Sequence, residues 1–283
     1  MTAEFGLPII GRMNLRSPRP QAALRPSARW RGWSLFAAGA LLSGSGWSAP
    51  QQLTVSWRDK PPYHYTDEVG AGKGFLLKRS QQVFRAAGIP ARFVNEPQKR
   101  IWANFQHGAA NYCSISWYKL PEREALAQFT MPIHEDQPHT ILASPEVAAR
   151  VKSHASVESL LADPELSLGV VEGVSYGPVL DPMIKASKNH VMSRTVETTQ
   201  MMRMLNAGRA SYMFVDREDW DYFRQNDKTR QIVVQLDLPG MPPGLRRHIV
   251  CSKDVPQATM DKLNKAIAAT GGIVNPGRSG KQK

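Results

Sequence analysis

The chain has 283 residues, and its 36 lysines and arginines against 24 acidic residues give a formal net charge of +12. The basic residues are scattered, and no basic stripe alternates with aromatic residues, so the composition disfavours nucleic-acid binding. The positive charge instead indicates an anionic ligand or an anionic envelope surface as the partner.

The first 48 residues have the features of an export signal. An arginine-rich stretch precedes the apolar run Trp33–Leu42, and small residues follow it. This order is typical of a signal peptide with a cleavage zone at its end. The apolar run is well short of the ~20 residues that a membrane-spanning helix needs, so an uncleaved anchor is disfavoured. We therefore expect residues 1–48 to be a signal peptide cleaved near Ser48, with translation starting at Met1 or Met13, and a periplasmic protein.

Only two cysteines occur, Cys113 and Cys251, and both lie in β-like runs. In an oxidising compartment such a pair can form a disulfide. The bond would close a loop of over a hundred residues, worth on the order of 4 kcal/mol in the chain-entropy model. The alternative is a pair of buried free thiols, and the residues alone leave both open.

Strands and helices are expected to alternate in the first half of the mature chain. Apolar residues on one face predict a helix that begins at Phe75 and stops before Gly88 and Pro90. In chain order we expect strand Leu53–Trp57, the turn-rich segment Asp59–Gly74, helix Phe75–Ala87, strand Ala91–Asn95, helix Lys99–His107 and strand Tyr112–Ser116. This alternation favours an α/β domain with a mostly parallel sheet.

A second series of similar outline follows, which predicts two similar lobes. It begins after a further strand, His139–Ser144, and comprises helix Val157–Leu161, strand Ser167–Val171, loop Gly173–Gly177, helices Val179–Ser187 and Thr198–Asn206, and strands Ser211–Val215 and Gln231–Leu236. A last strand at His248–Ser252 and a helix at Pro256–Ala269 complete the fold, with glycines as its C-terminal stop. Residues 273–283 are expected to be a disordered tail.

The segment Asn111–Pro132 holds the first candidate binding residue. Its strand runs into a polar loop and then into the turn Pro121-Glu122-Arg123. An arginine at the edge of a sheet offers a planar fork of donors that suits a carboxylate. The alternative is a solvated arginine that pairs weakly with Glu122 or Glu124.

The loop Gly173–Gly177 fits the G-x-S-x-G nucleophile elbow, and it lies between a strand and a helix. A serine hydrolase would also need an acid and a histidine downstream of Ser175, and Asp216 and His248 occur in that order. In the competing interpretation, which we favour, the loop is a helix N-terminus whose amides and Ser175 hydroxyl face a ligand.

A metal site is not expected. His134, Glu135 and His139 resemble a zinc-protease motif, but their spacing is one residue too long. Pro138 would also break the helix that aligns such ligands.

Taken in order, these features resemble the family 3 extracellular solute-binding proteins, the amino-acid type of periplasmic binding protein. The matching motifs are Pro61-Pro62-Tyr63, Gly74-Phe75, Gly108, Pro121-Glu122-Arg123, Phe129-Thr130-Met131-Pro132, Gly169-Val170-Val171-Glu172-Gly173, Leu205, Gly208-Arg209 and Val215-Asp216. The resemblance covers nearly all of residues 50–270, and the run CSISWYKLPERE at 113–124 indicates a separate branch of the family.

The resemblance implies a type II binding-protein fold: two α/β lobes, two hinge strands and a ligand cleft between the lobes. Lobe 1 would comprise residues 49–141 and 247–272, and lobe 2 residues 142–246. Cys251 would then lie on a strand beside Cys113, which favours the disulfide. Such a protein needs no cofactor and is expected to be a monomer that passes its ligand to a membrane transporter of the ABC type or to a sensor.

The resemblance also implies the ligand and the residues that hold it. Arg123 would bind the carboxylate of an amino acid or related compound, and Asp216 its ammonium group; the alternative is that Asp216 caps the following turn. The further candidates are aromatic walls and polar donors: Tyr63, Trp57, Trp117, Ser116, Ser175 and Tyr176. Trp117 has core packing as its alternative role. Some relatives with this fold are dehydratases or lyases, which is the second enzymatic alternative.

Three departures from the family pattern concern the ligand. Trp117, Tyr118 and Lys119 replace the usual small hydroxyl residues before the arginine, and Lys60 stands where an aromatic residue often stacks. Val174-Ser175-Tyr176 replaces a common pair of threonines. These bulkier and more cationic residues predict a larger or more acidic ligand.

Overall fold

The computed structural model describes residues 52–228 and 232–273, so the expected signal peptide and most of the expected tail lie outside the described residues. The first sheet has the strand order β4-β1-β5-β12-β6. Its strands are β1 (Leu53–Trp57), β4 (Ala91–Asn95), β5 (Tyr112–Tyr118), β6 (Ala127–Glu135) and β12 (Arg246–Ser252). β1 pairs in parallel with β4 and β5, whereas β12 runs antiparallel to β5 and β6.

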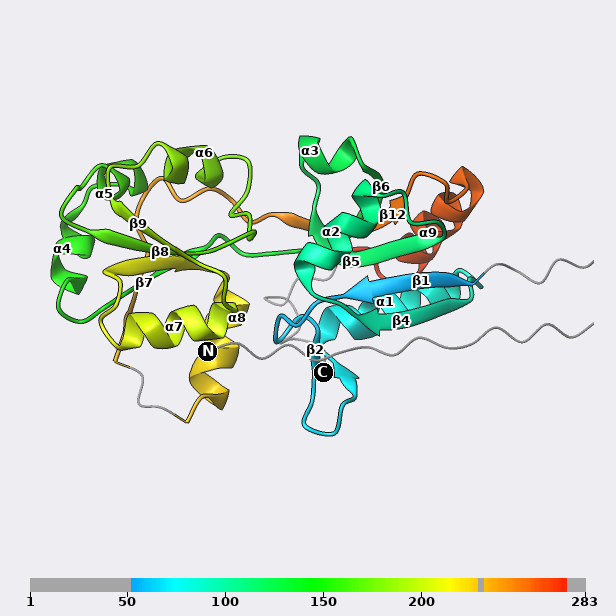
Figure 1. Ribbon diagram of the computed structural model, residues 1–283, viewed down its shortest axis with the longest axis horizontal. Helices are drawn as coiled ribbons and strands as arrows, with labels where there is room; N and C mark the ends of the chain where they lie inside the picture. Colours follow the sequence, from blue (N-terminus) through cyan, green and yellow to red (C-terminus); the bar gives the residue numbers. More distant parts are fainter. Residues whose placement is uncertain (1–51, 229–231, 274–283) are drawn as a thin grey trace, which may run out of the picture. The chain divides into compact units, whose positions relative to one another are not determined.

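Helices α1 (Phe75–Ala86), α2 (Gln98–Gln106) and α9 (Gln257–Ala269) lie beside this sheet (Figure 1). α1 begins at Gly74, whose φ is +113°, and a Cβ there would meet the backbone oxygen of Tyr63 at 2.4 Å. Only glycine therefore fits this turn. A short hairpin of β2 (Tyr65–Thr66) and β3 (Gly72–Lys73) precedes the helix.

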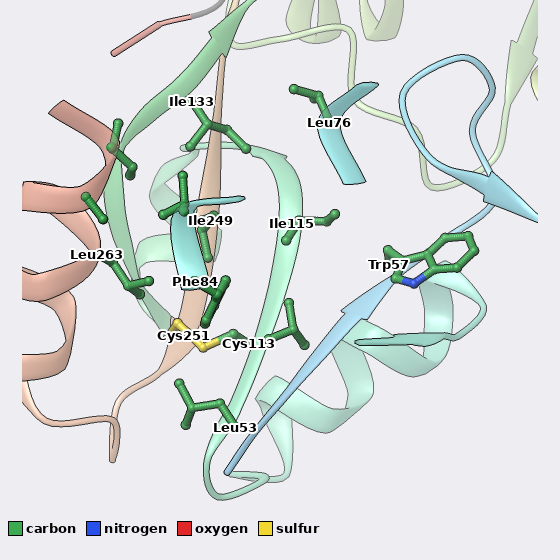
Figure 2. Packing of buried hydrophobic residues seen from close by; sticks show 14 of the residues in the cluster. Leu53, Trp57, Leu76, Phe84, Cys113, Ile115, Ile133, Ile249, Cys251 and Leu263 are labelled. Atoms are coloured by element: carbon green, nitrogen blue, oxygen red, sulfur yellow. A yellow bond between two sulfur atoms is a disulfide. The ribbon is translucent and has the colours of Figure 1, made fainter. Parts of the chain in front are cut away.

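The core of the first sheet contains the predicted disulfide. Cys113 of β5 and Cys251 of β12 are paired in register and joined by a disulfide, with their Cα atoms 4.0 Å apart. Figure 2 shows the bond among buried side chains that include Phe84 and Leu53. Because the bond links residues 138 positions apart, chain entropy gives it a stabilisation of about 5 kcal/mol.

The second sheet has the order β11-β7-β10-β8-β9. Its strands are β7 (Thr140–Ala143), β8 (Ser167–Val171), β9 (His190–Arg194), β10 (Tyr212–Val215) and β11 (Val234–Leu236). The helices of this part are α4 (Ala148–Ser153), α5 (Val157–Leu161), α6 (Leu180–Lys185), α7 (Thr198–Asn206) and α8 (Arg217–Asn226). None of the helices in the described part of the chain is long and apolar enough to cross a membrane.

The chain passes between the sheets twice, from β6 to β7 and from β11 back to β12 (Figure 1). The two crossing segments touch, since the Asp136 amide donates to the Leu245 carbonyl at 2.9 Å. A Cβ on Gly244 would lie 1.6 Å from the Asp136 carbonyl oxygen, so this close approach requires glycine. The two crossings are thus held against each other by backbone contact.

The structure contains elements that the sequence pattern did not indicate. No strand was expected at Ala127–Glu135, yet β6 is a nine-residue edge strand. Its register against β12 shifts near Pro132, which suits a residue without an N–H donor. β9 is a largely exposed edge strand, and α8 buries only part of a highly polar sequence, so neither has a clear hydrophobic pattern.

Candidate ligand-binding site

A small cavity of about 40 Å³ lies between the two sheets and is lined by residues from both of them. Arg58, Lys60, Ser116, Trp117 and Arg123 come from the side of the first sheet, and Ser175, Tyr176, Asp216 and Asp219 from the side of the second. An adjoining cavity of about 480 Å³ shares Arg58, Gln98 and Gly173 with it. The space available to a ligand therefore begins at Arg58 and Arg123 and continues past Gln98.

Two contacts join the lobes beside these cavities. The Gln98 side chain at the start of α2 donates to the Gly173 carbonyl in the loop after β8. The neighbouring Lys99 ammonium lies 3.4 Å from the Glu172 carboxylate. Lys99 and Glu172 are largely exposed, so their pair contributes little to stability.

Ser116 forms a bulge in β5 at the cavity wall. Ile115 pairs with Ile249 and Trp117 with His248, which leaves Ser116 as an extra residue with a φ of +70°. The residue is buried at 5% exposure, and its hydroxyl has no hydrogen-bond partner among residues 52–228 and 232–273. The strain lies in the backbone of Ser116, and its hydroxyl in the cavity wall is available to a ligand.

Two arginines lie over Trp117. The Arg123 guanidinium is 5.2 Å from the Trp117 ring centre and 4.9 Å from that of Trp102, and that of Arg58 is 5.6 Å from the Trp117 ring. Arg123 donates to the Tyr118 carbonyl at 3.2 Å. In residues 52–228 and 232–273, neither guanidinium has a carboxylate within ion-pair distance.

Asp216, unlike these two arginines, has several charged partners. One carboxylate oxygen lies 2.9 Å from the Lys60 ammonium and 2.9 Å from the Arg247 guanidinium, and the other is 3.1 Å from His139. Asp216 is the N-cap residue of α8, but its side chain makes no capping hydrogen bond. The capping alternative is therefore not realised, and this carboxylate is fully engaged by buried side chains.

Arg247 joins the two crossing segments. Its guanidinium lies 2.7 Å from Asp136 and stacks over the rings of Tyr63 and Tyr118, at 4.4 and 4.5 Å. It also donates to the Ser116 carbonyl at 3.3 Å. Burial lowers the pKa of Arg247, but the surrounding acidic groups, Asp136 foremost, outweigh it and raise that pKa well above its usual value.

Burial and charge act differently on the two cavity aspartates. Burial works to raise the pKa of Asp216, but Lys60, Arg247 and His139 together hold it well below the usual range. Burial raises the pKa of Asp219 to about 6, even though the side chain is paired with Lys60. Burial also lowers the pKa of Arg123 to about 10, and the charge of Arg58 adds to that effect.

The loop with the nucleophile-elbow pattern holds its serine in a different way from a hydrolase. The Ser175 hydroxyl donates to Asp181 at 2.5 Å and accepts from the Gly177 amide at 3.1 Å. His248 instead bonds the Thr130 carbonyl, and no histidine in the described ranges hydrogen-bonds Ser175. A serine nucleophile needs a neighbouring base, so this geometry does not favour the hydrolase alternative.

The two histidines that resemble a zinc-protease motif contact different carboxylates. His134 contacts Asp136 at 3.0 Å, and His139 contacts Asp216. Within the part of the chain that the structure describes, no group of three or more histidine, cysteine or acidic side chains is arranged to hold a metal ion.

Six of the eight predicted ligand-binding residues line the cavity: Arg123, Asp216, Trp117, Ser116, Ser175 and Tyr176. The other two lie elsewhere. Tyr63 is fully buried behind Lys60 and donates to Asp136 and Glu218, and Trp57 packs in the core of the first sheet (Figure 2). Both were expected to form aromatic walls, but neither lines the cavity: Trp57 packs among side chains of the first sheet, and the Tyr63 hydroxyl bonds Asp136 and, in the second lobe, Glu218.

The sequence did not single out Arg58, Asp219 or Arg247 as site residues. Arg58 directly follows the first strand, and Asp219 lies one helical turn after Asp216, which are the signals that point to them. The local sequence pattern could not identify Asp136 and Asp216 as the partners of Arg247, because both are distant from it in the sequence.

Two α/β lobes, connected by two crossings and enclosing a cavity between them, define the two-lobed class of ligand-binding proteins. Within this class the chain belongs to the bacterial extracellular solute-binding proteins, family 3, which residues 53–270 match. No curated protein matches the chain.

Solved structures share this fold. An ancestral arginine-binding protein bound to arginine is 20% identical, with 77% of this chain and 92% of that chain covered and a TM-score of 0.60. An ancestral amino acid-binding protein, a precursor of cyclohexadienyl dehydratase, is 18% identical over 77% and 88% of the two chains, with a TM-score of 0.61. A chain from the work on glutathione import via GshT and the cystine ABC importer TcyBC of Streptococcus mutans is 14% identical over 78% and 90%, with a TM-score of 0.62.

Proposed function

We propose that this solute-binding protein captures a small polar ligand with a carboxylate group, an amino acid or a related organic acid, in the cavity between its lobes. The observation that carries the proposal is the pair of guanidiniums, Arg58 and Arg123, which lie over one tryptophan ring and have no carboxylate of the described residues within ion-pair distance. Charged donors of this planar shape bind carboxylates through paired hydrogen bonds.

The remaining wall supplies directional contacts. Ser116 offers an unpartnered buried hydroxyl, and Ser175 and Tyr176 line the opposite side. Trp117 provides an apolar face between the arginines. Such a small number of placed polar groups in a cavity is typical of a binding site that fixes the orientation of its ligand.

The family and the sequence support a proposal for the setting of this function. We propose an exported protein, with the signal peptide removed near Ser48, that acts as a monomer in the periplasm without a cofactor and without catalysing a reaction. Lobe 1 (49–141 and 247–272) and lobe 2 (142–246) would close around the ligand. The loaded protein would then deliver it to an ABC-type membrane transporter or to a sensor; the similar chain from the work on glutathione import through an ABC importer supports the transporter.

The test is a thermal-shift screen of the purified protein against organic acids, amino acids, small peptides and polyamines, repeated with Arg123→Met. A saturable rise in melting temperature with carboxylates is expected, because a ligand that binds only the native state stabilises it. The Arg123→Met variant should lose that rise. A rise produced only by uncharged or cationic compounds, and retained in the variant, would overturn the proposal.

A further inference from the structure

The cavity holds its charges in two separate groups. The carboxylates that line it, Asp216 and Asp219, are both paired with the Lys60 ammonium. Asp216 is also paired with Arg247. Arg58 and Arg123, by contrast, have no carboxylate within ion-pair distance among the described residues. The cavity therefore offers positive charge to a ligand, while its negative charge is already used.

Lys60 is held in place by burial of its side chain and by backbone hydrogen bonds. Its side chain is only 6% exposed, and its ammonium lies 4.9 Å from the Tyr63 ring centre. Two backbone hydrogen bonds between Lys60 and His64, at 2.7 and 3.1 Å, hold the segment that carries it. The ammonium extends from lobe 1 to two carboxylates of lobe 2, so it occupies the place that a positively charged ligand group would otherwise take.

A ligand ammonium would meet unfavourable electrostatics here. It would have to displace the Lys60 ammonium from its carboxylates or lie unpaired beside Arg58 and Arg123. Both alternatives leave a charge without a partner in a partly dry site, which is costly. A ligand with carboxylates alone meets two unpaired guanidiniums and no free carboxylate.

We infer that Lys60 is a specificity-determining residue that selects organic acids without an amino group, dicarboxylates above all, over amino acids. The inference rests on the proposed function and narrows its ligand class. Two guanidiniums over one ring repel each other, and a dianion offsets both charges at once. Burial is the first cause of the lowered pKa of Arg123, and the charge of Arg58 lowers it further, which agrees with repulsion between the two guanidiniums.

The experiment uses pairs of compounds that differ only in the amino group. Isothermal titration of the purified protein compares succinate with L-aspartate and glutarate with L-glutamate. In each pair we expect the compound without the amino group to bind at least about tenfold more tightly, a difference of ~1.4 kcal/mol. The Lys60→Met variant should reduce or reverse this ratio, because it leaves Asp219 without its cation.

Lys73→Met is the matched control. Lys73 also forms an ion pair, with Asp67, but its side chain is 55% exposed and it is not part of the lining of either cavity. Its removal changes the net charge as Lys60→Met does, and the ratio should stay as in the wild type. Should Lys60→Met not fold, Lys60→Gln replaces it with the same expected change, and a wild-type ratio below tenfold overturns the inference without any variant.

Different results would overturn the proposed carboxylate ligand and the inference about Lys60. If amino acids bind as tightly as their partners without the amino group, the inference about Lys60 is overturned and the carboxylate site stands. If the ratio is at least tenfold but unchanged in a folded Lys60→Met variant, Lys60 is not its cause and the inference is likewise overturned. If neither member of any pair binds, the proposed carboxylate ligand is overturned together with the inference.

Discussion

Two clusters of positive charge lie side by side in the cavity wall and differ in how they are neutralised. In the paired cluster, Lys60 and Arg247 lie over the Tyr63 ring and are balanced by aspartates. In the open cluster, Arg58 and Arg123 lie over the Trp117 ring without such partners. Each cluster has two cations on one aromatic ring, so residue type alone does not tell them apart.

The difference separates a structural role from a binding role. A buried cation with charged partners contributes to holding the chain in one arrangement, and its loss leaves the partners uncompensated. A cation without partners lowers stability or adds little, and its charge is available to a ligand. The following changes break one cluster at a time, beginning with the largest expected effect.

Arg247→Met should strongly destabilise the fold. The substitution leaves Asp136 and Asp216 buried with fewer cations, at a cost of about 3–5 kcal/mol. Urea denaturation measures this change, with Arg246→Met as the control. Arg246 is the preceding residue of β12, and its pair with Glu135 is exposed, so its loss should cost about 1 kcal/mol or less. Equal effects of the two substitutions would contradict the structural role of the paired cluster.

Arg123→Met should weaken binding far more than it weakens the fold. Loss of hydrogen bonds from a charged group costs about 1.5–3 kcal/mol of binding free energy, roughly 10–150-fold in affinity. The unfolding free energy of the empty protein should change by only about 1 kcal/mol, since loss of the ring contacts and of the hydrogen bond to the Tyr118 carbonyl is partly offset by removal of a buried charge. Titration and urea denaturation of the same variant measure both. Arg100→Met, at an exposed position of α2, should change neither.

Ser116→Gly tests the residue that touches both clusters. The Ser116 carbonyl accepts from Arg247, and its hydroxyl lies in the cavity wall near the open cluster. Glycine adopts a φ of +70° without strain, so the empty protein should keep its stability or gain up to about 1 kcal/mol. Affinity for the carboxylate ligand should fall, because the hydroxyl is gone. A clear loss of stability in urea denaturation would argue against strain at this bulge.

The smallest effect concerns pH and the paired cluster. The folded pKa of Asp219 is about 6, above the usual value of 3.8, so the folded protein takes up a proton before the unfolded chain does. This contribution to stability is fully present below pH 3.8 and is lost as pH rises through 6. Between pH 7 and 6 the wild type should therefore gain a few tenths of a kcal/mol relative to Asp219→Asn. An unchanged difference between the two unfolding curves would show that Asp219 does not titrate there.

The helices and strands with a regular apolar pattern were predictable from the sequence. α1, β1, β4 and α9 lie within one or two residues of the expected ranges. The two helices each bury one apolar face, and β1 is almost entirely buried. α8 was not predictable in the same way, since acidic residues near its start are buried only through pairing with lobe 1. Its conformation depends on contacts that are remote in sequence.

The candidate site was predictable in its positions but not in its charge balance. The order of the motifs predicted that Arg123 and Asp216 lie at the same site, and both line the cavity. It gave no sign that Asp216 is engaged by Lys60 and Arg247, because these partners come from opposite ends of the chain. Which cations remain unpaired is a property of the folded arrangement.

The Cys113–Cys251 disulfide makes a covalent ring out of residues 113–251, and the whole second sheet lies inside it. A single protease cut between these cysteines would leave one covalently joined molecule, which separates into two fragments only after reduction and denaturation. The ring also orders biosynthesis, since it closes only after the entire second lobe has been made. Lobe 1 thus becomes covalently complete last, although its first strand is made first.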